Sequence, residues 1–395
     1  MKIPRHKRTG QQLRVENFGP IRQADVTFSD LTVLVGPQAT GKSILLQLLK
    51  LLVDTAYIKR EFNRAGVDWA GDFDGFLDVY FGEGMRSLWT NRTRITHSGE
   101  AVKLPERVEE KRAHRQESMF FIPAQRVLAL RDGWPSAFNY YDASVPFTLR
   151  EFSEHLRLLM SEFGVEGTLF PVSRRLKSEF RDLLQDHIFP GFDLKIDTDR
   201  AQKRLVLTGK ESGGGGLPVA VWSAGQREFV PLLLGLYYLM VPAKAPLRKG
   251  VEWAVVEELE MGLHPRAISV VMLMLFELMA RGYRVCISTH SPQVLDAVWT
   301  LQRLHDHGAS PSSLLEVFNV AKTPPMSKLA EQVMKRQVKV YYFDRGAGIT
   351  RDISNLDSSA EEAGDSGWGG LTEFSGRASA AVARAVANSD RRPRS

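Results

Sequence analysis

The residues with the clearest chemistry form an octapeptide at positions 36–43, Gly-Pro-Gln-Ala-Thr-Gly-Lys-Ser. The apolar segment Leu31 to Val35 before it predicts a strand, and the apolar segment Ile44 to Val53 after it predicts a helix. Glycines in such a turn let backbone N–H groups surround an anion at a helix N-terminus, while lysine and serine reach the phosphates and Mg²⁺. The octapeptide therefore predicts a phosphate loop for a nucleoside triphosphate. Its expected binding residues are Gly36, Pro37, Gln38, Ala39, Thr40, Gly41, Lys42 and Ser43, with Ser43 also a ligand of Mg²⁺.

Length and composition are those of an ordinary globular protein. The chain has 395 residues, 43% hydrophobic and 25% charged, which is enough for about two or three domains. Its net charge of +6 is compatible with nucleic acid or an acidic partner, and equally with solvated basic ends. The single cysteine, Cys286, rules out a disulfide framework, and the longest apolar runs are shorter than the ~20 residues of a membrane span. We expect a cytoplasmic protein with no membrane partner.

Periodicity divides the chain into four parts. Short strands are expected in 13–35, a hairpin in 92–103 that turns at Ser98-Gly99, and a strand in 119–122. Apolar residues at helical spacing in 150–190 predict a small helical subdomain, followed by a glycine connector at 213–216. Further predictions are a helix in 329–334, a hairpin in 338–352 and an amphipathic helix in 371–386. The expected parts are 1–149 (first half of the nucleotide-binding lobe), 150–218 (helical subdomain and connector), 219–350 (second half of the lobe) and 351–395 (acidic loop, helix and basic tail).

Three further motifs follow the phosphate loop in order. Trp222-Ser-Ala-Gly-Gln-Arg-Glu opens an apolar helix at Phe229. Residues 252–265 form an apolar strand that ends in two carboxylates and a Gly-Leu-His-Pro turn. Residues 284–292 form a strand that ends in Ser-Thr-His-Ser-Pro. Each motif alone has a plain structural explanation: a helix cap, a solvated strand end and a structural histidine.

Together these motifs resemble an ABC-type ATPase head. The resemblance covers residues 13 to about 298 and implies an α/β P-loop NTPase of two lobes, a mixed α/β nucleotide-binding lobe and a helical subdomain, that binds ATP and Mg²⁺. It assigns Glu257 to the Walker B metal site, Glu258 to the attacking water and His290 to the γ-phosphate switch. Ser223, Gly225 and Gln226 match the signature motif, which in that family contacts the γ-phosphate held by the opposite subunit. Gln125 matches the Q-loop glutamine, which the resemblance makes a catalytic and metal residue.

Within this family the details favour the stand-alone OLD and RecF-like group. Leu13-Arg-Val-Glu-Asn-Phe-Gly-Pro-Ile and Glu257-Glu-Leu-Glu-Met-Gly-Leu-His-Pro match that group's patterns. The interval between Ser43 and Ser223 shows no sustained heptads, which excludes a long coiled-coil arm, and no Asp-x-Asp follows His290. The chain also departs from the usual motifs, with Gln38, Ala224, Glu257 and Leu259 where Asn, Gly, Asp and Pro are common. These changes permit ATP binding and predict slow turnover.

The resemblance implies a switch that pairs two heads around ATP and gates a separate effector, such as a nuclease or toxin, in anti-phage defence or DNA maintenance. The segment 371–386 is the candidate docking helix, or else an ordinary helix of the core. An alternative is a DNA-binding repair clamp that uses the basic N-terminal arm and the hairpin region, and a second alternative is a transporter cassette. The basic residues of the hairpin region are Arg86, Arg92, Arg94, His97 and Lys103.

Overall fold

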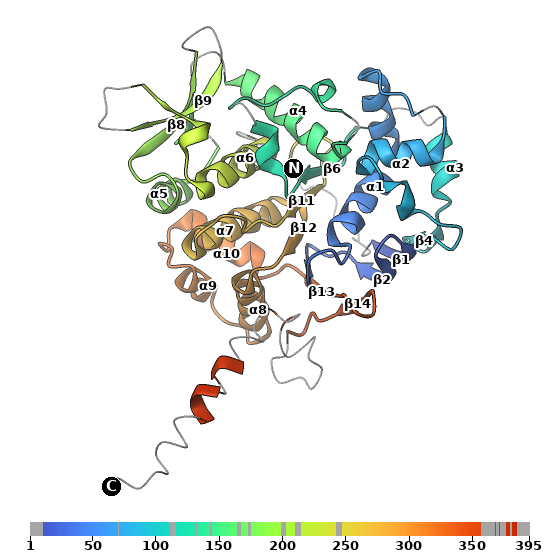
Figure 1. Cartoon of the computed structure of the whole chain (residues 1–395). Helices are drawn as coiled ribbons and strands as arrows, with labels where there is room; N and C mark the ends of the chain where they lie inside the picture. The colour runs from blue at the N-terminus through green and yellow to red at the C-terminus, as the bar shows by residue number, and fades with distance from the viewer. Residues whose placement is uncertain are drawn as a thin grey trace, which may run out of the picture.

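The computed structural model describes residues 11–356, except 70, 111–115, 131–132, 143, 164–166, 173–174, 199–202, 210–214 and 242–246, together with 368, 371, 377–379 and 381–384 (Figure 1). The predicted basic arm at 1–10, part of the glycine connector, most of the acidic loop, half of the helix 371–386 and the basic tail lie outside these residues. None of the described helices has the length and apolar character needed to cross a membrane.

Ten of the described strands form one sheet in the order β5-β4-β1-β2-β14-β13-β3-β12-β11-β6. Its centre is parallel, because β3 pairs in parallel with β13 and β12, β12 with β11, and β11 with β6. The strands are β1 (Gln12–Phe18), β2 (Ile21–Thr27), β3 (Leu31–Val35), β4 (Arg94–His97), β5 (Glu100–Ala101), β6 (Met119–Ile122), β11 (Trp253–Glu257), β12 (Arg284–Thr289), β13 (Val338–Asp344) and β14 (Ile349–Asp352).

A C-terminal hairpin completes this sheet between two N-terminal strands. β13 pairs with β3, where Val340 lies opposite Val33, and β14 pairs with β2, where Ile349 lies opposite Gln23. The β1–β2 hairpin therefore joins the parallel strands only through residues 338–352 among those described.

The parallel strands contribute to two hydrophobic cores, one on each face of the sheet. In β3, Val33 and Val35 belong to one core and Leu34 to the other, as the two-residue period of a strand requires. Helices α1–α3 cover the second face, and α6, α7, α8 and α10 cover the first (Figure 1). The described helices are α1 (Lys42–Arg64), α2 (Phe73–Phe81), α3 (Leu104–Glu109), α4 (Phe147–Glu162), α5 (Ser178–His187), α6 (Ala224–Leu239), α7 (Pro265–Arg281), α8 (Pro292–Asp306), α9 (Pro311–Val317) and α10 (Pro324–Val333).

Most predicted elements are confirmed. These are the strands in 13–35, the helix after the octapeptide, the strand 119–122, the helix at 329–334 and the hairpins 92–103 and 338–352. Ser98 and Gly99 make the first hairpin turn with φ of 53° and 87°, so both central residues have positive φ.

The predicted helical subdomain also contains a sheet. Besides α4 and α5, the chain between 168 and 218 forms the strands β7 (Thr168–Phe170), β8 (Phe192–Asp197), β9 (Arg204–Gly209) and β10 (Leu217–Pro218), which pair antiparallel in the order β10-β9-β8-β7. The helical spacing of 152–184 does not extend into these strands. β8 and β9 are short and partly exposed, so their two-residue alternation is a weak local signal.

Candidate nucleotide-binding and ATPase site

The octapeptide forms the turn between β3 and α1. Gly36 and Gly41 have φ of 138° and 94°, in the region that favours glycine. A Cβ atom on Gly36 would lie 2.5 Å from the carbonyl oxygen of Phe343, and one on Gly41 would lie 2.6 Å from Cγ1 of Ile21. Both positions therefore require glycine for conformation and for space.

Lys42 lies against the inside of this turn. Its ammonium donates hydrogen bonds to the carbonyl oxygens of Gly36 and Pro37, at 2.8 and 2.7 Å, and the Thr40 hydroxyl donates to that of Pro37. Burial lowers the pKa of Lys42 to about 8, although the nearby carboxylates oppose this shift. The attraction between an ammonium and a phosphate is stronger in such a desolvated site than in water. Of the remaining loop residues, Gln38 and Ala39 are exposed and Ser43 is half-buried.

The Walker B strand β11 ends at Glu257, which is 1% exposed. One carboxylate oxygen, Oε2, accepts a hydrogen bond from the Ala124 amide at 3.1 Å, while the buried Oε1 has no partner at hydrogen-bond distance. Burial raises the pKa of Glu257 to about 7, against the opposing effects of the Ser43 hydroxyl and the Ala124 amide.

These residues fit a magnesium ion. A buried carboxylate oxygen without a partner, next to a serine hydroxyl, supplies the oxygen donors that Mg²⁺ prefers, either directly or through water. Ser43 and Glu257 would hold the ion, which would neutralise charge on the phosphates.

Glu258 and His290 face each other beside Lys42. Glu258 has φ of 43°, an uncommon conformation for a residue other than glycine, and its amide donates to the Ser288 carbonyl at 2.9 Å. Its carboxylate lies 3.8 Å from Nε2 of His290. Burial, reinforced by Lys42, lowers the pKa of His290, which favours the neutral imidazole. The three groups meet at the carboxyl ends of β3, β11 and β12, where open α/β sheets bind ligands.

Gln125 follows β6 at the same edge of the sheet. The preceding residue, Ala124, donates to Glu257, so the backbone of Gln125 is next to the Walker B carboxylate, and its side chain is exposed. This placement is compatible with the predicted Q-loop role.

Arg126 has a role that sequence reasoning missed. It is fully buried and donates from Nη1 to the Glu257 carbonyl at 2.9 Å, from Nη2 to the Glu258 carbonyl at 3.1 Å, and from Nε to the Glu228 carbonyl at 3.2 Å. The guanidinium thus fixes the backbone that carries both carboxylates and ties it to the signature helix α6. Its position directly after Gln125 was the only available signal.

Glu260 is a second residue without a predicted role. Its carboxylate accepts a hydrogen bond from the His290 amide, while its buried Oε2 has no partner. Burial raises its pKa, and it acts electrostatically on Lys42. Glu260 therefore links the Walker B turn to the loop that carries His290. The available signal was a third carboxylate in Glu-Glu-Leu-Glu.

The signature residues lie apart from this cluster, at the start of α6. Ser223 caps the helix by accepting from the Gln226 amide, and the Gln226 side chain accepts from the Ser223 amide, which makes a capping box. The predicted helix cap is thus present, and Ser223 and Ala224 are exposed as well. A Cβ atom on Gly225 would lie 2.9 Å from the Gly262 carbonyl oxygen, which gives this glycine a packing role. Within the described part of the chain, the Ser223 hydroxyl is hydrogen-bonded to Gln226 and not to the phosphate loop.

Two family models match the chain. One, described as "AAA ATPase domain", matches residues 11–127, and the other, described as "AAA domain, putative AbiEii toxin, Type IV TA system", matches residues 149–296. Together they contain the phosphate loop, the signature, the Walker B strand and His290. The chain thus carries AAA-type ATPase domains over these two ranges. This ATPase therefore binds ATP and converts it with water to ADP and phosphate.

The ATPase also resembles solved structures at low identity. An SMC head bound to the C-terminal winged helix domain of ScpA is 12% identical, with 86% of this chain and 95% of that chain covered and a TM-score of 0.43. The SMC head domain from Thermotoga maritima is 12% identical, with 86% and 97% covered and a TM-score of 0.36. A dimeric bacterial ABC transporter cassette is 10% identical, with 86% and 97% covered and a TM-score of 0.32. No curated protein matches the sequence.

Proposed function

We propose that this ATPase is a switch in which two heads pair around ATP and gate a separate effector protein, in anti-phage defence or DNA maintenance. Each phosphate loop would face the Ser223 of the partner copy, so that two ATP molecules are enclosed between the heads. Hydrolysis, assisted by Glu258, His290 and Gln125, would release the pair. The effector would be a nuclease or toxin on another chain.

The observation that carries this proposal is the exposed start of α6. A helix of 16 residues presents the positive end of its dipole at its N-terminus, which favours an anion there. Apolar side chains surround it, since Val221 is 62% exposed and Leu217 is 41% exposed. The Trp222 indole holds this segment by donating to the Leu217 carbonyl at 2.8 Å. An anion site with an apolar border suits a surface that closes on a second ATP-loaded copy.

The test is the mass in solution of Glu258→Gln with and without Mg-ATP. This variant should bind ATP, hydrolyse it slowly and accumulate as a complex of two or more copies, because the water loses its polarising carboxylate. Adding Ser223→Arg should leave ATP binding intact and block the complex, since the bulky cation occupies the anion site.

A matched control separates blocked pairing from loss of a helix cap. Ser310 is also an exposed serine that caps a helix, α9, by accepting from the Ser312 amide. Glu258→Gln with Ser310→Arg should still form the complex on addition of ATP. An ATP-dependent complex that survives Ser223→Arg would exclude the proposed pairing surface.

The C-terminal segment is the proposed docking site for the effector. Trp368 lies near Trp299 of α8, with tilted rings whose centroids are 6.4 Å apart, and Leu371 packs against the core. The described helical residues beyond it, 377–379 and 381–384, are exposed and lie away from the body of the molecule (Figure 1), with Val382 63% exposed. Ending the chain after 371 should therefore leave ATP hydrolysis unchanged and abolish action on the effector.

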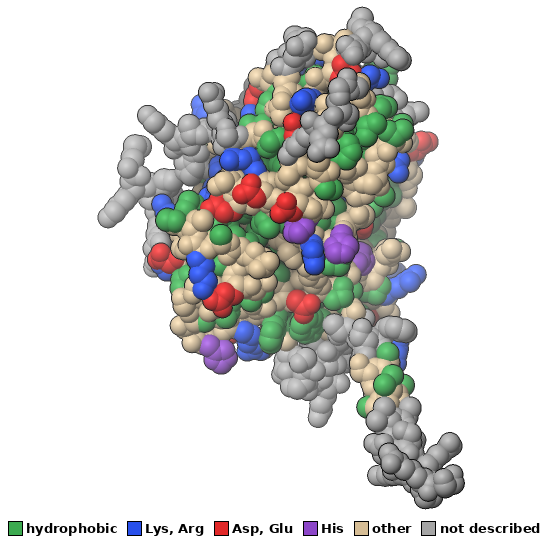
Figure 2. Space-filling view, turned by 90° about the vertical axis from the view of Figure 1, so that its left-hand side faces the viewer, with side chains coloured by type: hydrophobic (Ala, Val, Ile, Leu, Met, Phe, Trp, Pro, Cys, Tyr) green, Lys and Arg blue, Asp and Glu red, His purple; other side chains and the backbone are tan. Residues whose placement is uncertain are grey.

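The DNA-clamp alternative has less support. Arg86 is paired with Asp78, and Lys103 with Glu106 at 2.8 Å, so their charges are partly neutralised. Nη1 of Arg94 donates to the backbone carbonyls of Asn91 and Thr93. Figure 2 shows the face away from this hairpin region, where basic side chains are interspersed with acidic ones. An affinity for duplex DNA that rises on addition of ATP and falls steeply with salt concentration would support the DNA clamp.

A further inference from the structure

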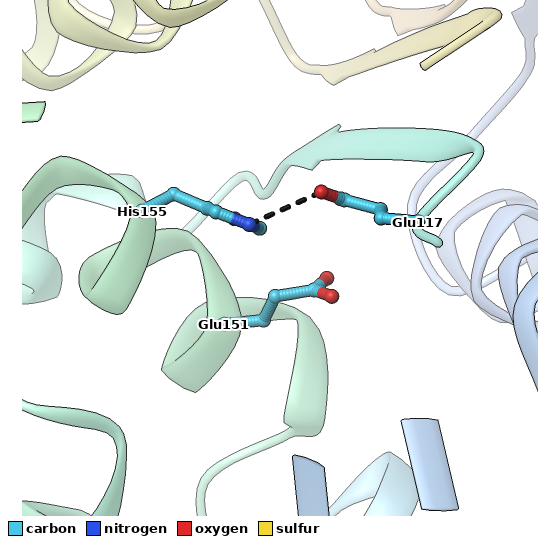
Figure 3. A group of neighbouring side chains, drawn as sticks. All are labelled: Glu117, Glu151 and His155. Carbon is cyan, nitrogen blue, oxygen red and sulfur yellow. Dashed lines mark ion pairs between the residues drawn. The ribbon is translucent and has the colours of Figure 1, made fainter. Parts of the chain in front are cut away.

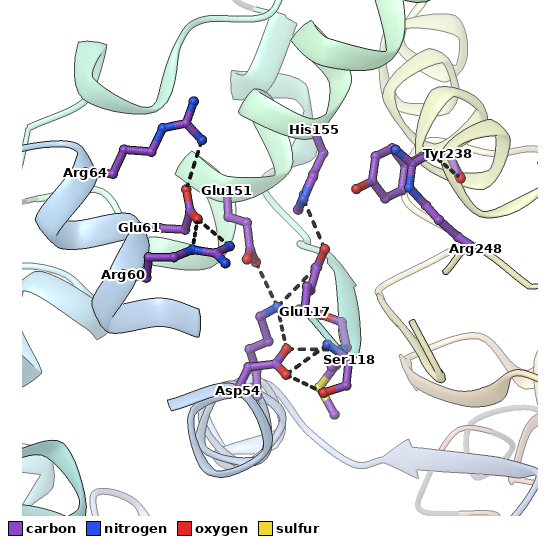
Figure 4. Close-up of polar contacts among 12 residues, drawn as sticks. Asp54, Arg60, Glu61, Arg64, Glu117, Ser118, Glu151, His155, Tyr238 and Arg248 are labelled. Atoms are coloured by element: carbon purple, nitrogen blue, oxygen red, sulfur yellow. Dashed lines mark hydrogen bonds and ion pairs between the residues drawn. The ribbon is translucent and has the colours of Figure 1, made fainter. Parts of the chain in front are cut away.

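A buried group of five charged side chains lies at the junction of three segments. Lys50 and Asp54 belong to α1, Glu117 lies two residues before the start of β6, and Glu151 and His155 belong to α4. None of the five is more than 7% exposed. Figure 3 shows Glu117, Glu151 and His155 pointing toward one another, and Figure 4 shows Asp54 completing the group from below.

The ammonium of Lys50 occupies the centre of this group. Ligand atoms of Glu117, Glu151 and His155 all lie within 4.8 Å of one another, a spacing that could hold a metal ion. However, Nζ of Lys50 lies 2.9 Å from the Asp54 carboxylate and 3.1 Å from each of the two glutamates, and donates to the Met119 carbonyl. The lysine thus takes the position that a metal cation would need.

The charges in the group compensate one another. Burial raises the pKa of Glu151 to about 8 although Lys50 opposes it, so this carboxyl retains its proton at neutral pH. Burial opposes ionisation of Glu117, but His155 and Lys50 outweigh it and lower its pKa to about 2. His155 has a raised pKa because Glu117, at 3.1 Å, outweighs its burial. The shifts favour the charged forms of His155 and Glu117 and the neutral form of Glu151, so opposite charges lie beside one another, which makes the burial of the group tolerable.

Asp54 connects this group to the start of β6. Its Oδ1 accepts from the amide and hydroxyl of Ser118, at 2.9 and 2.6 Å, and its Oδ2 accepts from the Met119 amide at 3.0 Å. Asp54 itself has non-helical φ and ψ of −115° and 21°, so α1 is kinked where it meets the strand. Since β6 ends directly before Pro123-Ala124-Gln125, Asp54 fixes one end of a strand whose other end contacts Glu257.

His155 connects the group to the signature helix. Its ring lies 4.7 Å from that of Tyr238 on α6 and 5.3 Å from that of Phe120 on β6. The group therefore meets the helix that begins at the phosphate loop, the strand that leads to Gln125 and, through α4, the helix that begins at Ser223.

We propose that Lys50 is a positioning residue for ATP hydrolysis: its ammonium holds α1, β6 and α4 together and thereby sets the positions of Gln125 and the signature helix relative to the phosphate loop. This inference rests on the roles proposed above for Gln125 and Ser223. Lys50 touches no reacting group, and its effect is on geometry two turns away from Lys42.

The test is the double variant Lys50→Met with Glu117→Gln, which removes one positive and one negative charge and keeps similar volumes. ATP binding should change little, with KM within about twofold, because the phosphate loop is untouched. The kcat value should fall by about tenfold to a hundredfold, because small displacements of catalytic groups cost that much. Hydrogen exchange of residues 116–126 should become faster.

A matched control is Lys177→Met with Glu277→Gln, an ion pair between the N-cap residue of α5 and α7 that has no contact with the group. It should leave kcat and KM unchanged. If the Lys50 double variant is folded and keeps the wild-type kcat, the proposal is wrong and the group only stabilises the fold.

Two further variants keep the result interpretable. Asp54→Asn keeps the contacts of Lys50 with the two glutamates and weakens both its ion pair with residue 54 and the connection to β6, so it serves if the double variant does not fold. It should speed hydrogen exchange at 118–119 and lower kcat at constant KM, and faster exchange with full kcat would overturn the proposal.

Gln125→Ala tests separately whether Gln125 takes part in ATP hydrolysis. Full activity of Gln125→Ala beside a slow Lys50 variant would reject the role of Gln125 and retain positioning through α6.

Discussion

At the scale of single residues, burial gives similar side chains different chemistry. Glu257 is buried and its pKa is raised to about 7, whereas the side chain of Glu258 is 31% exposed and faces His290. The Glu257 carboxylate suits a metal site, and the Glu258 carboxylate suits contact with water. The resemblance in the sequence assigned these residues to one ATP site. It could not predict Arg126, because that side chain holds carbonyls 131 and 132 residues further along the chain.

Lys42→Ala should abolish ATP hydrolysis and weaken ATP binding. It removes charge-assisted hydrogen bonds to the phosphates worth about 1.5–3 kcal/mol each. Phosphate release and calorimetric titration with ATP measure the two effects. Lys335→Ala, which changes an exposed lysine of an i, i+4 pair, should behave like the wild type. Normal turnover by Lys42→Ala would refute the active-site assignment.

Arg126→Lys should lower kcat by about tenfold to a hundredfold with little change in KM, since a lysine cannot reproduce three hydrogen bonds in a fork. Steady-state kinetics with ATP provide the measurement. The control is Arg175→Lys, where another largely buried arginine donates to a backbone carbonyl, that of Tyr237, away from the site. Equal losses in both variants would mean that Arg126 contributes stability alone.

At the scale of elements, local periodicity was sufficient to predict secondary structure where one strand and one helix flank a motif. The strand 31–35 and the helix after the octapeptide are examples, although α1 continues to Arg64, past the predicted end at Val53. The group around Lys50 could not be predicted in the same way. A lysine within Leu48-Leu-Lys-Leu-Leu is typical of a solvated helix edge, and its partners at 117 and 151 come from distant segments.

Glu151→Gln should make stability less dependent on pH between about 5 and 8. The wild-type carboxyl ionises at about 4.5 when unfolded and at about 8 when folded, so the folded state binds the extra proton in this window. Wild-type stability therefore falls as pH rises, with a slope of at most about 1.4 kcal/mol per pH unit from this group. Urea unfolding at pH 5, 6, 7 and 8 measures both proteins. Parallel curves would show that Glu151 is ionised in the folded protein throughout.

At the scale of the whole molecule, the exposed border of the signature helix should control pairing. Val221→Asp places a charge beside the anion site, so Glu258→Gln carrying it should bind ATP normally and form far less complex. Light scattering with and without Mg-ATP gives the result. Val317→Asp, at another exposed valine on α9, is the control and should pair normally. Pairing unaffected by Val221→Asp would place the interface elsewhere.

The insertion of β13 and β14 between β2 and β3 also constrains the order in which the sheet can fold during synthesis. The sequence predicted this hairpin but not its neighbours, because pairing across some 300 residues leaves no local pattern. During synthesis, the edges of β2 and β3 must wait unpaired until residue 352 has left the ribosome, and exposed edges invite aggregation. The backbone of Phe343 also lies against Gly36, so the phosphate loop lacks this contact until β13 has been synthesised. A nascent chain should therefore be unable to bind ATP until the residues up to about 352 have been translated.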